Sequence, residues 1–153
     1  MGRKGGKAQK RWALYGELHN EVAAKIAENG IYLDFNYNDD ENCQKDYDTN
    51  IMGRFFCRNQ GCENEGWTSK KIAITIRLYR GGRYNARVYY QRCKRCNCLS
   101  KPLLDFSYAD RVAYRLKKWH DVKVDKPDTG PREGPPHARE LCEGCKAGHC
   151  KGF

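Results

Sequence analysis

Nine cysteines in 153 residues constrain this chain more than any other feature of its sequence. All but Cys43 fall in three clusters: Cys57 and Cys62; Cys93, Cys96 and Cys98; Cys142, Cys145 and Cys150. Two of the spacings are CxxC, which lets two thiolates point at one ion from a tight turn, and zinc binds four such ligands tetrahedrally. A disulfide framework is the alternative, but the count is odd and the basic, polar N-terminus does not resemble a secretion signal. The pattern therefore predicts structural zinc.

Spacing alone suggests how the first ligands combine. Cys57 and Cys62 precede a predicted hairpin, and Cys93 and Cys96 follow it, so both ends of one antiparallel unit can meet at one ion, as in a zinc ribbon. In an interleaved arrangement, the C-terminal CxxC pair would instead share a site with Cys57 and Cys62. The spacing does not choose between these two partitions.

The last cluster supplies three cysteines and needs a fourth ligand. His137, five residues before Cys142, can supply it, and His149 is the rival because Cys-x2-Cys-x3-His is also a possible zinc pattern. Cys43 and Cys98 are surplus in either arrangement and are expected to be ordinary thiols.

Two segments have the three- and four-residue apolar spacing of an amphipathic helix. In residues 11–29 the apolar positions are Trp12, Tyr15, Leu18, Val22 and Ile26, and Gly30 stands where a C-terminal cap belongs. In the segment SYADRVAYRLKKWH, Ser107 and Asp110 have the spacing of a capping box. Its apolar stripe is Val112, Leu116 and Trp119.

Between these helices the pattern changes to the two-residue period of strands. Residues 72–79 and 84–90 alternate in this way around Gly81-Gly82, which predicts a hairpin. A three-residue loop would pair Leu78 with Tyr84 and Ile74 with Val88, which puts apolar faces together. The fold class expected is therefore α+β: a small zinc-stabilised antiparallel sheet, resembling a zinc-ribbon hairpin, with two packed helices.

The expected organisation has three parts. Residues 1–10 form a disordered basic tail, and residues 11–50 form the N-terminal helix and an acidic loop (34–50) packed on the zinc domain. Residues 51–153 form the zinc-binding domain, which includes a Pro/Gly-rich linker over 121–136. No apolar run approaches the roughly 20 residues of a membrane span.

Several stretches resemble the 3CxxC-type zinc-binding domain family, which includes receptor-transporting and zygote-arrest proteins and many fungal proteins. The matching stretches are GRFFCRNQGC…GWTSKKIAI, YNARVYYQRCKRC and PPHARELCEGCKAGHC, and SYADRVAYRLKKW looks closest to the fungal branch. One departure is the first pair, which is Cys-x4-Cys here. The resemblance implies two zinc ions per chain. It also implies their ligands, namely Cys57, Cys62, Cys93, Cys96, His137, Cys142, Cys145 and Cys150.

The formal charge of +10 indicates a polyanionic partner. It coexists with an acidic segment, 34–48, which is either a solvated loop or a cover over part of the basic surface. We expect a non-catalytic module that binds nucleic acid, RNA favoured, because closed zinc sites leave no open position for catalysis. RNA association among zygote-arrest relatives supports this. The candidate binding residues lie on the outward face of the hairpin, around the Cys93–Cys96 pair, and on the second helix. They are Arg77, Tyr79, Arg87, Tyr89, Arg92, Lys94, Arg95, Arg111, Arg115 and Lys118.

The alternative function is a protein-interaction or trafficking adaptor of the receptor-transporting type, without a membrane anchor. Its contact would lie on tyrosines and the N-terminal helix. Neither a small-molecule substrate nor an enzymatic activity is expected, and the expected location is the cytoplasm or nucleus.

Overall fold

The computed structural model describes residues 10–125 and 137–150. The predicted basic tail (1–10) lies outside the described residues except for Lys10. The predicted linker (121–136) lies outside them from residue 126 onward.

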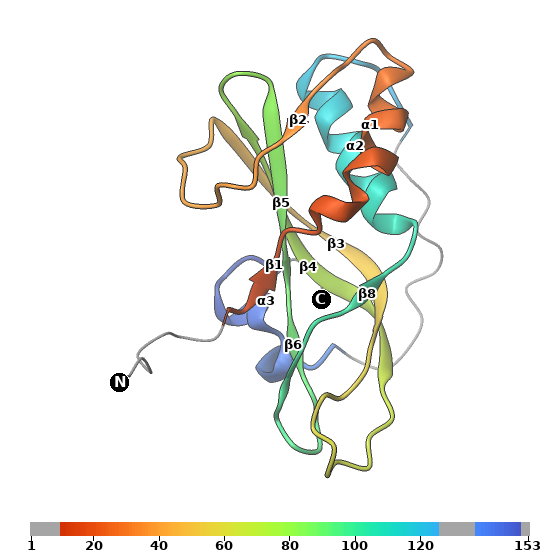
Figure 1. Cartoon of the computed structure of the whole chain (residues 1–153), viewed down its shortest axis with the longest axis vertical. Coiled ribbons are helices and arrows are strands. Elements are labelled where there is room, and N and C mark those ends of the chain that lie inside the picture. Colours follow the sequence, from red (N-terminus) through yellow and green to blue (C-terminus); the bar gives the residue numbers. More distant parts are fainter. Residues whose placement is uncertain (1–9, 126–136, 151–153) are drawn as a thin grey trace.

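A curled sheet, antiparallel except for the pairing of β2 with β5, forms the centre of the fold (Figure 1). Its long strands are β3 (Lys45–Phe55), β4 (Trp67–Tyr79) and β5 (Arg83–Tyr89). Three short strands complete it: β1 (Trp12–Ala13) and β2 (Asp34–Phe35), which pair with β5, and β8 (Leu103–Leu104), which pairs with β3. The sheet and the helices described below confirm the predicted α+β class.

The predicted hairpin is β4 and β5, in the predicted register. Leu78 lies opposite Tyr84, and Ile74 lies opposite Val88, so the connection is the three-residue loop. The two glycines of this loop have φ values of 83° and 71°, which residues with a side chain rarely adopt. The apolar pattern thus specified both the turn and the pairing.

Two helices, α1 (His19–Ala27) and α2 (Ser107–Trp119), cover one face of the sheet (Figure 1). The main core lies between them and the sheet. It includes Val22, Ile26, Ile72, Ile74, Ile76, Val112 and Leu116, all fully buried. An ion pair of 3.0 Å between Lys25 and Asp110 also joins the two helices.

The N-terminal helix begins at His19, so its predicted start at Arg11 is wrong. Trp12 pairs instead with Tyr89 of β5, which commits this part of the backbone to the sheet. Tyr15 has a left-handed backbone, with φ of 54°, and its hydroxyl donates a hydrogen bond to the Pro102 carbonyl. The 3-10 turn η2 (Gly16–Leu18) follows and leads into the helix. Burial of the Tyr15 ring in the core therefore outweighs the helical pattern.

Helix α2 covers the predicted segment, but the predicted capping box is wrong. The backbone N–H of Ser107 donates to Oδ1 of Asp105 at 2.8 Å, and its hydroxyl accepts a hydrogen bond from the N–H of Met52 at 2.8 Å. Asp110 is paired with Lys25 rather than with the helix start. The side chain of Ser107 thus ties the helix to β3.

The loop predicted over residues 34–50 is wrong at both ends, because Asp34 and Phe35 form β2 and β3 begins at Lys45. Residues 45–51 pair with residues 72–78 of β4 in an unbroken antiparallel ladder. Asp46 and Asp48 point to one face of this strand, whereas Tyr47, Thr49 and Ile51 share the face of the core. The strand also crosses the boundary at residue 50 that the sequence suggested between domain parts.

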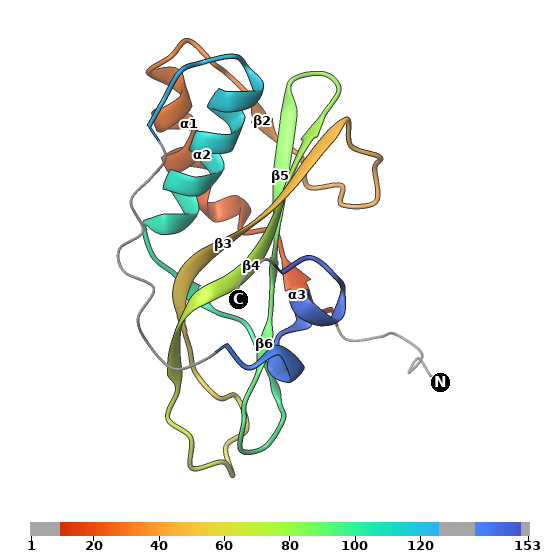
Figure 2. The same cartoon turned by 180° about the vertical axis from the view of Figure 1, so that it is seen from behind.

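A third, smaller layer lies on the opposite face of the sheet (Figure 2). It consists of the 3-10 turn η3 (Arg139–Leu141) and the short helix α3 (Glu143–Lys146). Its own small core contains Ala73, Tyr89 and Cys142. Below it, β6 (Gln91–Arg92) and β7 (Leu99–Ser100) form a separate two-stranded ribbon. Within the described ranges, no helix is long and apolar enough to cross a membrane.

Candidate functional site

The structure brings the eight predicted metal ligands together in two groups of four. One group is Cys57, Cys62, Cys93 and Cys96, and the other is His137, Cys142, Cys145 and Cys150. Within each group, all ligand atoms lie within 4.8 Å of one another. The paired partition is therefore the one the chain adopts, and the interleaved alternative is wrong. We call the two groups the first and the second zinc site.

The first zinc site joins the β3–β4 loop to the β6–β7 loop at the lower tip of the molecule in Figure 1. The Sγ atoms of Cys57 and Cys96 are 3.4 Å apart, and those of Cys62 and Cys93 are 3.7 Å apart. Four sulfurs around one zinc ion at about 2.3 Å would be separated by about 3.8 Å. The geometry fits a zinc ion, and the Cys-x4-Cys departure does not prevent closure of the site.

Hydrogen bonds to sulfur hold the first site in shape. Asn64 Nδ2 donates to Cys93 Sγ at 3.2 Å, and the N–H of Arg95 donates to the same sulfur at 3.4 Å. A hydrogen bond from the backbone of Cys98 is the main reason that the pKa of Cys96 falls to about 6. Because zinc binds thiolates rather than thiols, donors of this kind favour the ligand form.

The fourth ligand of the second zinc site is His137 and not His149. Nε2 of His137 lies 3.4 Å from Cys145 Sγ and 3.5 Å from Cys150 Sγ, close to the roughly 3.6 Å expected around a shared zinc ion. His149 is turned away: its Nδ1 lies 3.0 Å from Asp48, and its ring stacks on Tyr89. The two sites therefore fit two zinc ions, one with four sulfurs and one with three sulfurs and a nitrogen.

The second zinc site is pressed closely against the sheet. A Cβ atom added to Gly144 would lie 2.3 Å from Cβ of Ala73, so only glycine fits between Cys142 and Cys145 at this position. Next to it, the side chain of Glu143 is buried yet ionised: burial would raise its pKa, but hydrogen bonds from Arg92 and Lys146 lower it on balance. Sequence analysis missed this carboxylate because nothing in its spacing distinguishes it.

The surplus thiols Cys43 and Cys98 belong to neither group of four, in agreement with the prediction. Neither of them forms a disulfide in the described part of the chain.

The hairpin face predicted to bind nucleic acid is not open, so that prediction is wrong about the surface. The acidic loop covers it: Oδ1 of Asp39 accepts hydrogen bonds from Arg87 Nε at 2.8 Å and Arg77 Nη1 at 3.2 Å. Oδ2 of Asp39 accepts one from Trp12 Nε1 at 2.6 Å. Of the two roles considered for the acidic segment, it is a cover over basic residues.

The aromatic residues of that face are buried as well. Tyr79 and Tyr89 are only 1% and 3% exposed, and the hydroxyl of Tyr79 donates to Asn85. Neither ring can stack on a base without rearrangement of the layer above it. Tyr89 belongs to the small core with Ala73 and Cys142, and the ring of Tyr79 is covered by the guanidinium groups of Arg77 and Arg83.

The other candidate residues are divided between buried and exposed positions. Arg92 is paired with Glu143, whereas Lys94 and Arg95 are exposed in the first zinc site. The three residues of α2 lie on one face of the helix, with spacings of four and three, but differ in exposure. Arg115 stacks on the ring of Tyr47 at 3.5 Å, Arg111 lies 3.4 Å from the Thr49 hydroxyl, and Lys118 is exposed.

Sequence analysis also missed an exposed pair beside the first zinc site. Arg54 lies over the ring of Phe56 at 5.2 Å, and Phe56 is 45% exposed. The sequence shows two consecutive phenylalanines, Phe55 and Phe56, after Arg54, but it does not reveal which of the two rings is exposed. Phe55 is buried and stacked on Trp67, so Phe56 is the outer ring.

Comparison with known families agrees with this geometry. The model of the 3CxxC zinc-ribbon family, described as a zinc-binding domain, matches residues 50–148. That range contains seven of the eight ligands of the two sites and ends before Cys150. No curated protein and no solved structure matches the chain.

Proposed function

We propose that this chain, which belongs to the 3CxxC family of zinc-binding domains, is a non-catalytic module that binds single-stranded nucleic acid, with RNA favoured. Four protein ligands at each zinc site leave no open position for a water or a substrate, which supports a structural role for the metal. Reduced thiolate ligands suit the cytoplasm or nucleus, where we place the protein. The net charge of +10 favours a polyanionic partner.

The observation that carries this proposal is the exposed Arg54–Phe56 pair. A guanidinium held over a half-exposed ring offers a cation for a phosphate and an aromatic surface for an unpaired base. No ion pair among residues 10–125 and 137–150 involves Arg54, so its charge is available to a ligand. Stacking on single strands favours RNA loops and ends over a closed duplex.

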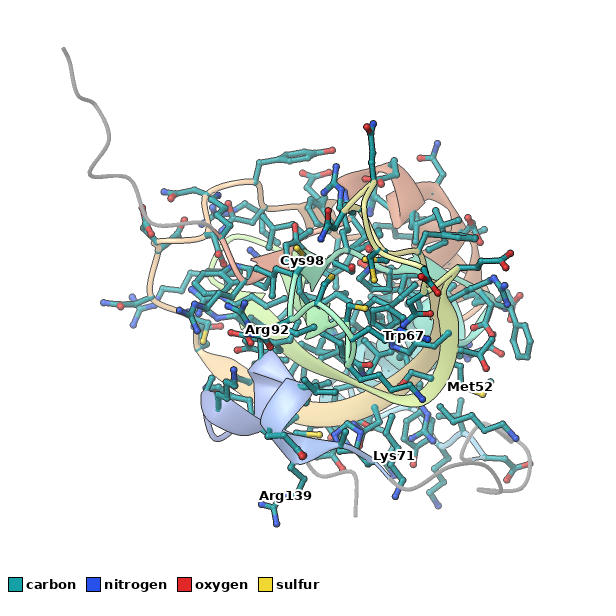
Figure 3. The ribbon with its side chains drawn as sticks, turned by 90° about the horizontal axis from the view of Figure 1, so that it is seen from below. Met52, Trp67, Lys71, Arg92, Cys98 and Arg139 are labelled. Carbon is teal, nitrogen blue, oxygen red and sulfur yellow. The ribbon has the colours of Figure 1, made fainter. Side chains whose placement is uncertain are left out.

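Neighbouring elements extend this surface. Arg54 lies opposite Thr68 of β4 and Leu103 of β8, and Leu103 is 63% exposed. Lys71, farther along β4, is half-buried, and Trp67 of the same strand packs against the main core (both are labelled in Figure 3). The first zinc site places Lys94 and Arg95 nearby, because Cys96 meets Cys57, the residue after Phe56. The proposed surface is therefore Arg54, Phe56, Lys71, Lys94 and Arg95.

The test is a titration of a fluorescently labelled single-stranded oligouridine with the zinc-loaded chain, followed by anisotropy at several salt concentrations. Phe56→Ala should cost about 1–3 kcal/mol of binding free energy with little change in salt dependence. Arg54→Gln should reduce the slope of log affinity against log salt by about 0.7, one phosphate contact on a single strand. A deoxyribose strand of equal length should bind more weakly than the RNA.

Matched controls come from the opposite end of the sheet. Tyr37, 72% exposed, and Arg80, exposed in the hairpin loop, offer a ring and a cation outside the proposed surface. Tyr37→Ala and Arg80→Gln should leave the affinity unchanged. Equal losses in the controls, or no loss in Phe56→Ala, would contradict the proposal.

One observation favours the alternative of a protein-interaction adaptor. Tyr32 and Tyr37, on either side of β2 and next to α1, are 79% and 72% exposed. An adaptor that used them would bind RNA weakly, and no variant of the proposed surface would change that weak binding. The same titration therefore distinguishes the two functions.

A further inference from the structure

The two zinc sites are joined through the backbone. Strand β6 leads directly into the ligand Cys93 of the first site, and it also forms an antiparallel bridge between Gln91 and the ligand Cys142 of the second site. The N–H of Glu143 donates to the carbonyl of Tyr90 at 3.1 Å. The segment that leads into a ligand of the first ion thus pairs with a ligand of the second ion and with the residue after it.

A buried carboxylate strengthens this junction. Glu143, between the second site's CxxC cysteines, is 2% exposed. Its Oε2 accepts a hydrogen bond from Arg92 Nε at 2.9 Å, and its Oε1 accepts one from Arg11 Nη1 at 2.6 Å. A carboxylate removed from water is costly unless its partners stay in place, so the position of Glu143 depends on Arg92 together with Arg11 and Lys146.

The same guanidinium also holds the first zinc site. Arg92 Nη1 donates to the carbonyl of Asn97 at 3.0 Å. Asn97 has a left-handed backbone, with φ of 61°, and its N–H donates to the carbonyl of Cys93. In Figure 3, Arg92 lies between α3 and Cys98, the two sides that it connects. One side chain therefore contacts the ligand loops of both ions.

We propose that the Arg92–Glu143 pair couples the two zinc sites, so that each ion binds more tightly when the other is present. Arg92 and Glu143 are positioning residues and not ligands. Loss of the second ion frees α3 and leaves Arg92 without its partner, which loosens the loop of Cys93 and Cys96. By thermodynamic linkage, loss of the first ion must weaken the second site by the same factor.

The experiment measures metal affinity site by site in the full chain. Cobalt replaces zinc, and its visible absorption distinguishes a four-sulfur site from one with three sulfurs and a nitrogen. Glu143→Gln should weaken the first site about tenfold, the lower end for outer-sphere partners, although it touches none of its ligands. Arg92→Gln should weaken the second site similarly.

The double variant tests coupling directly. If the pair acts as a unit, Arg92→Gln with Glu143→Gln should weaken each site about as much as either single change does. Matched controls are Glu140→Gln, in the ligand segment of the second site, and Arg58→Gln, in the Cys57–Cys62 loop of the first site; both residues are exposed, and both changes should leave the two affinities unchanged. An unchanged first site in Glu143→Gln, or effects that multiply in the double variant, would overturn the proposal.

A graded series of chelator concentrations provides a further readout. The two cobalt spectra should be lost at more similar chelator concentrations in the wild type than in Glu143→Gln, because coupling brings the loss of the two ions closer together. An equal separation in the two proteins would overturn the coupling.

Discussion

At the scale of single residues, the structure separates two histidines that the sequence left as rivals. His137 directs Nε2 at the sulfurs of the second zinc site, whereas His149 binds Asp48. We therefore predict that His137→Ala loses the ion of the second site, while His149→Ala retains it. His137→Cys should retain it too, because a thiolate can replace the imidazole. Metal content per chain after gel filtration measures all three, and loss in His149→Ala alone would reverse the assignment.

Buried tyrosines lead to a prediction about alkaline pH. Burial raises the pKa of Tyr84 and of Tyr108 well above the ordinary value of 10.0. A group that holds its proton more tightly when folded contributes stability below its unfolded pKa, and that contribution is lost as the pH rises above it. The free energy of unfolding in urea should therefore fall above about pH 10. Tyr84→Phe removes one such group and should make the fall shallower; an identical pH profile would contradict the explanation.

At the scale of elements, apolar periodicity predicted those features of the fold that depend on residues close together in the sequence. The β4–β5 register and the extent of α2 followed from apolar periodicity. The start of α1 did not, because Tyr15 reaches Pro102, which is far away in the sequence. Strand β3 was missed because its acidic residues indicated a loop, although Tyr47, Thr49 and Ile51 do alternate with polar residues.

The same limit applies to the sites. Cysteine spacing indicated zinc, and the resemblance to the 3CxxC family supplied all eight ligands, since metal ligands leave a pattern in the sequence. The exposure of individual Lys and Arg side chains leaves no such pattern in the sequence. The cover of Asp39 over Arg77 and Arg87 depends on the folded path of the acidic loop, so the surface predicted for nucleic acid was wrong.

The acidic loop provides a prediction at this scale. Asp39→Asn should lower the free energy of unfolding by about 1–3 kcal/mol, because two partly buried guanidinium groups lose their charged partner. Asp40→Asn, on an exposed neighbour, should change it by less than about 0.5 kcal/mol. Urea denaturation with zinc in excess makes the comparison. Equal effects of the two substitutions would mean that the loop does not hold the sheet face.

At the scale of the whole molecule, the fold has two apolar layers of unequal size. The core beneath α1 and α2 is extensive, whereas the opposite layer contains only three buried apolar residues among those described. We predict that chelation detaches the smaller layer and the lower tip, while a thiol reductant alone leaves both intact. Near-ultraviolet circular dichroism should report this loss, and a spectrum that reductant changes as much as chelator would point to disulfides instead.

The most direct test of the account is the metal content and ligand environment of the folded chain. Elemental analysis should give two zinc ions per chain. X-ray absorption should show an average of 3.5 sulfurs and 0.5 nitrogen per zinc ion, because the two groups together supply seven sulfurs and one nitrogen to two ions. A folded chain that carries less than one zinc ion would contradict the account.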